Sequence, residues 1–134
     1  MYVALRRYFD HSPSCSVYSN RSVIASDSTE ELYIDFSESV GTSLSLDNIS
    51  VTESVRGDHT SFHFVSSSIR DLGSVDNGVH RFAATFRVIG TGSIAISVGS
   101  GVVESRNGVS NSASNEWEIL VTERLLTEGV FNPR

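Results

Sequence analysis

The chain has 134 residues, of which 39% are hydrophobic and 19% are charged, and its formal net charge is −6. This length predicts one domain, which buries roughly two thirds of the surface of its unfolded chain without cross-links. The ten basic residues are all Arg and, apart from Arg6-Arg7, are scattered singly. Nucleic-acid binding needs clustered positive charge, so this class of function is disfavoured. Phosphate-binding P-loops and Schiff-base mechanisms need a lysine amine, so both are excluded.

The single cysteine, Cys15, excludes an internal disulfide and is expected to be a partly buried small hydrophobic residue. The N-terminal residues lack the apolar core of a signal peptide, and no stretch is long enough to span a bilayer. We therefore expect a soluble protein or one domain of a longer exported chain. Residues 1–13 are interpreted as a leader or upstream linker, residues 14–122 as the domain, and residues 123–134 as a C-terminal linker or tail.

The first half of the chain contains extended segments separated by polar turns. In one of them Leu32, Ile34 and Phe36 alternate with polar residues, and a period of two is typical of half-buried strands. The other strands follow from β-branched or aromatic residues at alternate positions. A turn in the middle of the first strand can break it in two. The predicted strands cover residues 15–25, 31–40, 44–54 and 61–69.

Three further strands are predicted in the second half. Asn77-Gly78, within the predicted turn 71–78, tolerates the positive φ angles of a tight hairpin. Phe86 is expected on the inward face of the strand 79–89, with Arg81, Ala83, Thr85 and Arg87 facing outward. Residues 90–121 form two alternating runs joined by a long polar loop, with Trp117 facing inward in the second run.

About seven strands with no long helical pattern predict an all-β protein, a sandwich or a barrel. The strands are expected to pair antiparallel, because parallel sheets need crossover helices that the sequence lacks. The three remaining segments are a polar turn at Arg56-Gly57-Asp58, a possible helical turn that includes Leu5, Tyr8 and Phe9, and a linker or short helix over 122–134.

Two stretches resemble a known family. FSESV at residues 36–40, followed by LDNISVT at 46–52, is similar to the FSEPV and DDITVT-like opening of bacterial Ig-like (Big) repeats of surface adhesins. The stretch from Gly90 to Ile119 resembles the second half of the same repeat, and the similarity covers residues 15–121. Ser39, Ser105 and Val109 depart from the family's usual Pro, Asp and Asn, and residues 59–75 form a longer insert. The resemblance implies an Ig-like, Greek-key sandwich with no catalytic residue.

Residues 90–95, GTGSIA, match the text of a dinucleotide-binding loop, but that motif needs a helix to begin there. The alternation continues instead, which favours a turn joining two strands. His59 and His63 would be about 13 Å apart along a strand. This is too far for two ligands of one zinc ion, so we expect no metal site there.

A nucleophile–base–acid triad of His80, Asp35 and a serine is a coincidence that a Ser-rich chain offers easily, and no serine has the flanking glycines of a nucleophile elbow. The pairing of Cys15 with a histidine is equally weak. Calcium can bind between Ig-like repeats through loop carboxylates, but solvated loop charges are the preferred interpretation. The carboxylates concerned are Asp27, Glu38, Asp47 and Glu104.

The sequence therefore predicts no catalytic, cofactor-binding or metal-binding residue, and no cofactor. We expect a non-enzymatic structural or adhesive module at the cell surface, a spacer or binding repeat of a larger extracellular protein. Its partners would be neighbouring Ig-like domains and a surface receptor or glycan, with no nucleic acid and no membrane insertion. A carbohydrate-binding module is the alternative, with Tyr33 and Tyr18 as the aromatic residues that could stack on a sugar. A small hydrolase on the same scaffold is a third class.

Overall fold

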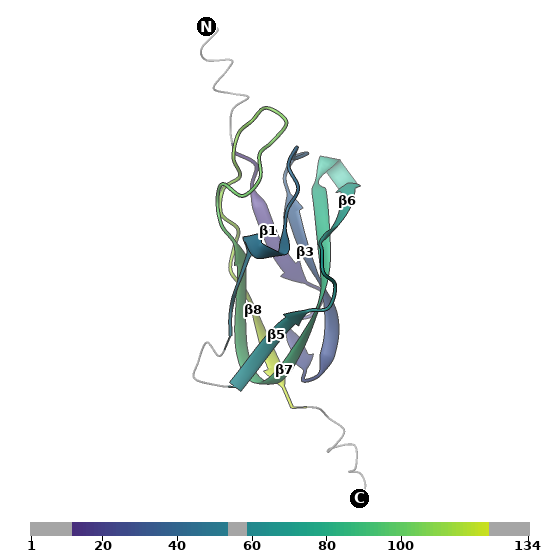
Figure 1. Ribbon diagram of the computed structural model, residues 1–134, viewed down its shortest axis with the longest axis vertical. Coiled ribbons are helices and arrows are strands. Elements are labelled where there is room, and N and C mark those ends of the chain that lie inside the picture. The colour runs from purple at the N-terminus through teal and green to yellow at the C-terminus, as the bar shows by residue number, and fades with distance from the viewer. Residues whose placement is uncertain (1–11, 54–58, 124–134) are drawn as a thin grey trace, which may run out of the picture.

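The computed structural model describes residues 12–53 and 59–123 as an elongated, two-layer β-sandwich (Figure 1). Within these residues there are eight strands and two short 3₁₀ helices, and no helix is long and apolar enough to cross a bilayer. The strands are β1 (Cys15–Ser19), β2 (Val23–Ala25), β3 (Ser28–Phe36), β4 (Ile49–Thr52), β5 (His59–Phe64), β6 (Arg70–Ser74), β7 (His80–Val98) and β8 (Trp117–Thr122). The 3₁₀ helices are η1 (Leu46–Asn48) and η2 (Asp76–Gly78).

The long strand β7 belongs to both layers. Up to Thr91 it pairs with β3 on one edge and with β5 and β6 on the other, and from Gly92 onward it pairs with β4 and β8. The change of layer takes place at Gly90 and Gly92, which have φ angles of 101° and 131°. A side chain on Gly90 would also collide with the carbonyl oxygen of His59. The predicted turn at residues 90–95 is therefore wrong, because the strand bends here without breaking.

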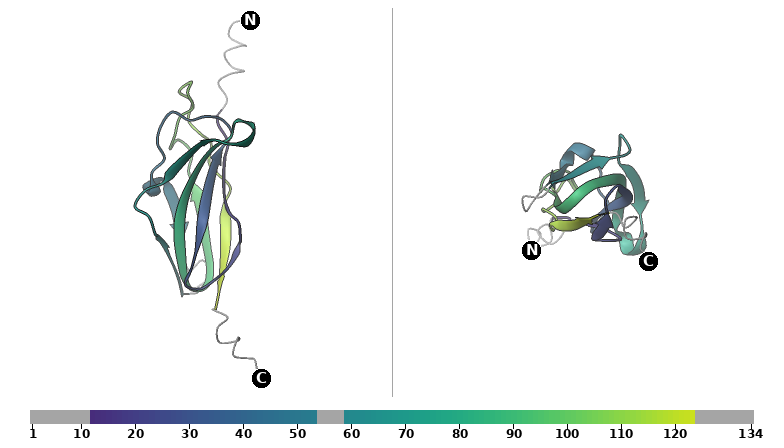
Figure 2. Two further views of the ribbon diagram at one scale, coloured as in Figure 1. Left: turned by 90° about the vertical axis from the view of Figure 1, so that its right-hand side faces the viewer. Right: turned by 90° about the horizontal axis from the view of Figure 1, so that it is seen from below.

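We call the layer of β1, β3, β5, β6 and the first part of β7 layer A, and that of β2, β4, β8 and the rest of β7 layer B (Figure 2). When the two parts of β7 are counted as separate strands, one in each layer, the strand order is that of an Ig-like sandwich. The predicted all-β antiparallel sandwich is confirmed, with one exception: β2 and β8 run parallel. No crossover helix is needed for this pair, because the two strands are far apart in the sequence and the rest of the domain connects them.

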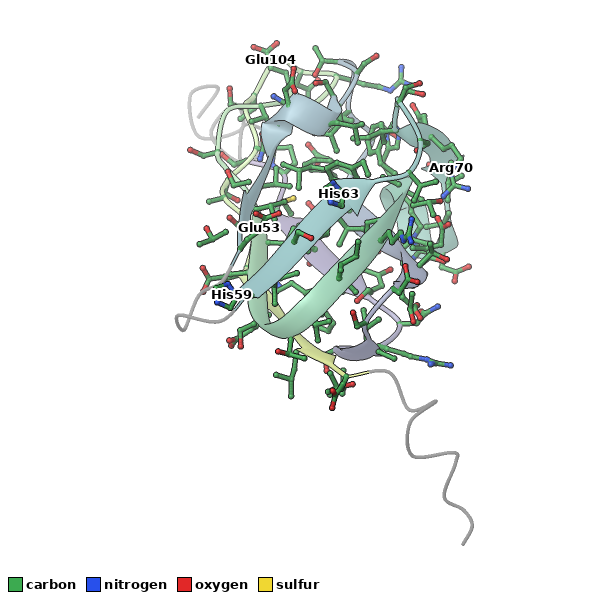
Figure 3. All side chains as sticks on the ribbon, turned by 60° about the horizontal axis from the view of Figure 1, so that its bottom comes forward. Glu53, His59, His63, Arg70 and Glu104 are labelled. Carbon is green, nitrogen blue, oxygen red and sulfur yellow. The ribbon has the colours of Figure 1, made fainter. Side chains whose placement is uncertain are left out.

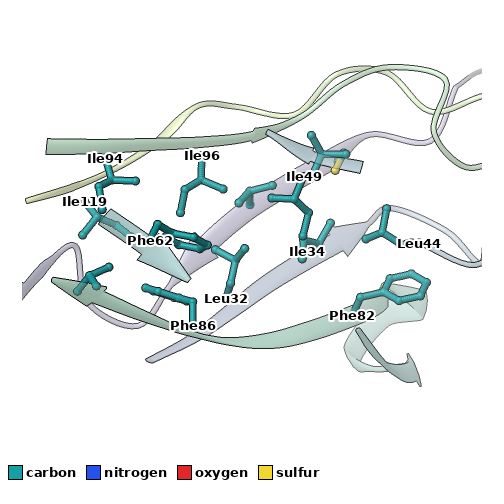
Figure 4. Close-up of a cluster of buried hydrophobic side chains, with 14 of the residues drawn as sticks. Leu32, Ile34, Leu44, Ile49, Phe62, Phe82, Phe86, Ile94, Ile96 and Ile119 are labelled. Atoms are coloured by element: carbon teal, nitrogen blue, oxygen red, sulfur yellow. The ribbon is translucent and has the colours of Figure 1, made fainter. Parts of the chain in front are cut away.

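The core lies between the layers, where the predicted inward residues meet (Figure 4). Leu32, Ile34, Phe36 and Phe86 are fully buried, and the Phe86 ring stacks on Phe62 with 4.9 Å between centroids. Five inward residues of layer B are buried equally well: Ile94, Ile96, Val98, Ile119 and Val121.

Two side chains differ from the prediction in their burial. Ala83 points outward but is buried, and its cross-strand partners on either side are the longer residues Tyr33 and Arg70. Trp117 faces inward yet is only half-buried, and its indole N–H donates a hydrogen bond to the Ser19 hydroxyl, 2.9 Å away.

Several element boundaries also differ. The predicted first strand is broken as expected, and its two parts, β1 and β2, lie in different layers. Within the predicted strand 44–54, residues 46–48 are helical, and within 61–69 the strand ends at Phe64. The predicted turn 71–78 contains most of strand β6, so the hairpin is tighter than expected, with Asn77 and Gly78 at φ angles of 59° and 80°.

The described chain enters the sandwich at one pole and leaves it at the other (Figure 1). The turn predicted at residues 56–58, the helical turn at 5–9 and the tail after residue 123 lie outside the described residues.

Candidate binding surface

The outward side of layer A, which we call face A, carries a connected polar network. The Arg81 guanidinium forms two hydrogen bonds with the Asp35 carboxylate, of 2.8 and 3.0 Å, and the Tyr18 hydroxyl donates to the same carboxylate at 2.9 Å. These residues come from β7, β3 and β1, which lie side by side in the sheet. Strand pairing therefore places one acid between two donors.

The electrostatics follow from this arrangement. Burial, the hydrogen bond to Asp35 and the negative charge of Asp35 raise the pKa of the Tyr18 phenol above its usual value. The hydrogen bonds to Asp35 also raise the pKa of Arg81 above its already high value. Both groups therefore stay protonated at neutral pH and hold the carboxylate in place.

Further ion pairs extend face A along the sheet. Glu31 accepts hydrogen bonds from Arg70 and from the Thr85 hydroxyl, the latter at 2.6 Å. Arg87 pairs with Asp27 at the neighbouring turn. Asp27, which the sequence offers as a possible calcium ligand, is thus engaged by a guanidinium.

The two tyrosines of the carbohydrate-binding alternative are brought together on face A. Tyr18 and Tyr33 are direct cross-strand partners, with ring centroids 5.5 Å apart and a tilt of 31°. However, the Arg81 guanidinium lies over the Tyr33 ring, 5.5 Å from its centroid. A sugar could stack on that side of the ring only by displacing a guanidinium that Asp35 already holds by two hydrogen bonds.

His80 has different partners from those of a serine-based triad. Its Nδ1 accepts the backbone N–H of Val40 at 3.0 Å, so Nε2 carries the proton and donates to Asp71 at 2.8 Å. Asp35 lies instead in the network of face A, and no serine hydroxyl within the described residues bonds to His80. The arrangement ties the β3–β4 connection to β6, which is a structural role.

Cys15 also lacks the features of a nucleophile. It is buried at the start of β1, and burial, with a smaller effect from the charge of Asp35, raises the pKa of its thiol to about 12. An activated cysteine requires a lowered pKa. The prediction of a small buried hydrophobic residue agrees with this burial.

The possible metal ligands stay apart. His59 and His63 are exposed on β5, and Glu104 lies at the opposite end of the molecule (Figure 3). Among residues 12–53 and 59–123, no three His, Cys, Asp or Glu side chains lie close enough together to hold a metal ion. Glu38 and Asp47 both lie in the connection between β3 and β4, and they are not brought to Asp27 or Glu104 in such a group.

Two asparagines of the β7–β8 loop have roles that sequence analysis missed. The Asn115 amide accepts the N–H of Val17 at 2.8 Å and donates to its carbonyl oxygen at 3.0 Å, as a neighbouring strand would. Asn111, 2% exposed, bonds four backbone groups of its own loop. Both lie in a polar loop with no periodic pattern, so no sequence signal separates them from solvated residues.

Comparisons with known proteins add little to this description. No protein-family model matches the chain, and no curated protein matches it in sequence. A solved structure, the non-cellulosomal cohesin from the hyperthermophilic archaeon Archaeoglobus fulgidus, aligns over 90% of this chain and 99% of its own, with 10% identity and a TM-score of 0.38. We draw no conclusion about function or partners from a similarity this low.

Proposed function

We propose that this chain is a non-enzymatic structural and adhesive module, a spacer or binding repeat of a larger cell-surface protein. One observation carries the proposal: the described chain enters and leaves the sandwich at opposite poles (Figure 1). Domains of this kind can be joined end to end into a stiff rod, in which each unit adds its full length. A fold alone does not choose among functions, so the proposal rests on this placement of the ends.

The pairing of the last strand, β8, with β2 near the start of the domain supports a load-bearing role. β2 and β8 are parallel neighbours, linked by register pairs from Val23–Leu120 to Ala25–Thr122. A force that pulls the two ends apart slides these strands past one another, so it acts on all their hydrogen bonds together. Bonds that are pulled in this direction cannot open one at a time.

The edge of β1 supports use in an array of many copies. An open strand edge is a template for pairing with another chain. Here the Asn115 amide occupies both backbone groups of Val17. Neighbouring units, held at high local concentration, are thereby hindered from pairing through this edge.

The family and the location are part of the same proposal. The FSESV stretch and the residues from Gly90 to Ile119 resemble bacterial Ig-like repeats of surface adhesins, which implies an extracellular position. Residues 1–13 and 123–134 would then connect the domain 14–122 to neighbouring Ig-like domains. A surface receptor or glycan would be the ligand of the larger protein.

Single-molecule pulling tests the load-bearing role. We expect a high unfolding force when the chain is pulled by its two ends, which load β2 and β8 in the sliding direction. The comparison is a pull between the N-terminal end and Asn107→Cys, in a Cys15→Ala background. This loop is bonded to the entry pole through Ser112 and Pro13. Equal forces in the two geometries would contradict the proposed spacer.

A carbohydrate-binding module is the second candidate, and it is favoured by the cross-strand pair of Tyr18 and Tyr33 on face A. Binding on a glycan array that disappears in Tyr33→Ala, but persists in Phe64→Leu on the other side of the sheet, would support this function. Binding that is unchanged in Tyr33→Ala would exclude face A as the sugar site.

A further inference from the structure

A groove of about 410 Å³ opens between η1 and the connection from β5 to β6. η1 precedes β4 in layer B, whereas β5 and β6 belong to layer A. The groove therefore lies at the side of the sandwich where an edge of each layer is exposed. Its volume falls within the range of pockets that bind small ligands.

The lining combines an apolar floor with several polar side chains that have no side-chain partner among the described residues. Leu44 is buried at the floor, and Leu46 and Ile69 beside it are half-buried.

The rim is polar, and three of its groups are exposed hydroxyls: Ser43, Ser67 and Ser68. These hydroxyls and the Asp47 carboxylate form no side-chain hydrogen bond or ion pair with any described residue. The hydroxyl of Ser45, in contrast, is occupied by the Asp47 backbone N–H.

The charge of the groove has one sign. No Arg or His of residues 12–53 and 59–123 lines it, and Arg70, which follows Ile69 in the sequence, is turned to Glu31 on face A. Among the described residues of the lining, Asp47 is therefore the only charged one, in a chain with a net charge of −6. A cationic group is favoured here, and anionic ligands are repelled.

We propose that this groove binds an extended segment of a partner protein through one Lys or Arg side chain. Such a side chain has an aliphatic stem that can lie on Leu44, Leu46 and Ile69, and a charged end that can reach Asp47. The serine hydroxyls, each a donor and an acceptor, would pair with the amide groups of the segment. The described part of the lining has no aromatic ring on which a sugar could stack, which disfavours a glycan. The inference rests on the proposed adhesive function, for which it supplies a binding site.

The test is an NMR titration of the full chain with three probes. They are a capped peptide with a central Arg, the same peptide with a central Glu, and a neutral oligosaccharide. We expect the methyl signals of Leu44, Leu46 and Ile69 to shift with the Arg peptide alone. Shifts of these methyls by the Glu peptide or the oligosaccharide, or no shift with any probe, would overturn the proposal.

Matched variants assign the charge. Asp47→Asn should weaken binding of the Arg peptide about three- to fivefold, as expected for one solvent-exposed ion pair. Asp76→Asn is the control, because Asp76 also lies in the first turn of a 3₁₀ helix but outside the groove. Equal weakening by both variants would overturn the role of Asp47. Because pulling experiments do not involve the groove, a failure here leaves the spacer function standing.

Discussion

The two outer faces of the sandwich are built on the same alternation but have opposite chemistry. Face A is crossed by ion pairs such as Arg81–Asp35 and Arg87–Asp27. On the outward side of layer B, which we call face B, small residues dominate, and Glu118 is the one charged residue among the described strand residues. The outward strand residues of face B are Val23, Ala25, Ser50, Thr52, Ser93, Ala95, Ser97, Glu118, Leu120 and Thr122.

This difference shows what a period of two determines and what it does not. The period determines which residues face the core, and it does so equally in both layers. The chemistry of an outer face depends instead on which side chains become neighbours across the strands. Face A carries side chains that bond across the strands, whereas face B has an exposed apolar pair, Val23 and Leu120, at 55% and 47% exposure.

The largest loss of stability is expected from substitutions in the core between the two layers. Phe86→Ala should lower the free energy of unfolding by about 3–5 kcal/mol, because Phe86 is fully buried and stacked on Phe62. Trp117→Ala should cost less, because Trp117 is only half-buried. Urea unfolding of both variants measures this order. A smaller loss for Phe86→Ala would show that the ring is not a central part of the core.

The next largest loss of stability should distinguish face A from face B. Asp35→Ala leaves Arg81 and Tyr18 without their acceptor and should cost about 1–2 kcal/mol, since the network is partly exposed to solvent. Ser97→Ala, at an outward strand position of face B, should change the free energy of unfolding by less than about 0.5 kcal/mol. A double-mutant cycle of Asp35→Ala and Arg81→Ala gives the coupling. A coupling energy near zero would mean that the Asp35–Arg81 pair of face A does not stabilise the fold.

The inward residues, the all-β class and the Asn77-Gly78 turn could be predicted because each depends on local pattern alone. The continuity of β7 could not, because Gly90-Thr91-Gly92 has the composition of a turn and the bend is selected by close packing against His59. β6 is a polar edge strand with no alternation. The parallel pairing of β2 with β8 joins opposite ends of the domain, which no local signal indicates.

Contacts between residues that are distant in the sequence also limit what could be predicted about sites. The partner of His80 is Asp71 and not Asp35, because a register shift between Asp71 and Gly73 in β6 places that carboxylate beside the ring. The groove joins Leu44 and Asp47 to Ile69, which are neighbours only after the two layers have packed. Tyr18 and Tyr33 could be named as aromatic candidates, but the guanidinium over Tyr33 comes from a third strand.

The pH dependence of stability should come from layer A, where hydrogen-bonded titratable groups are concentrated. Burial tends to raise the pKa of Asp71, but hydrogen bonds from His80 and the Gly73 N–H outweigh it, so the pKa lies below its ordinary value of 3.8. A lowered pKa stabilises the fold above 3.8, and this contribution is lost as the pH falls through the folded value. Asp71→Asn should therefore flatten the acid limb of the stability–pH profile relative to the parent chain. A profile that is unchanged in Asp71→Asn would remove layer A as its source.

The smallest effect concerns Cys15, on the inner side of layer A. Its thiol has a pKa raised to about 12, mainly by burial, so the native protein should not react with a disulfide reagent at pH 8, whereas the urea-unfolded chain should react at once. The matched control is Ser16→Cys in a Cys15→Ala background, because residue 16 is the outward neighbour in the same strand and is exposed. A raised pKa also stabilises the fold below the unfolded value of about 9, and this contribution is lost as the pH rises towards 12. Between pH 9 and pH 12 the free energy of unfolding of Cys15→Ala should therefore fall less than that of the parent chain. Rapid reaction of native Cys15 would mean that β1 separates from the sandwich, and with it the edge that Asn115 covers.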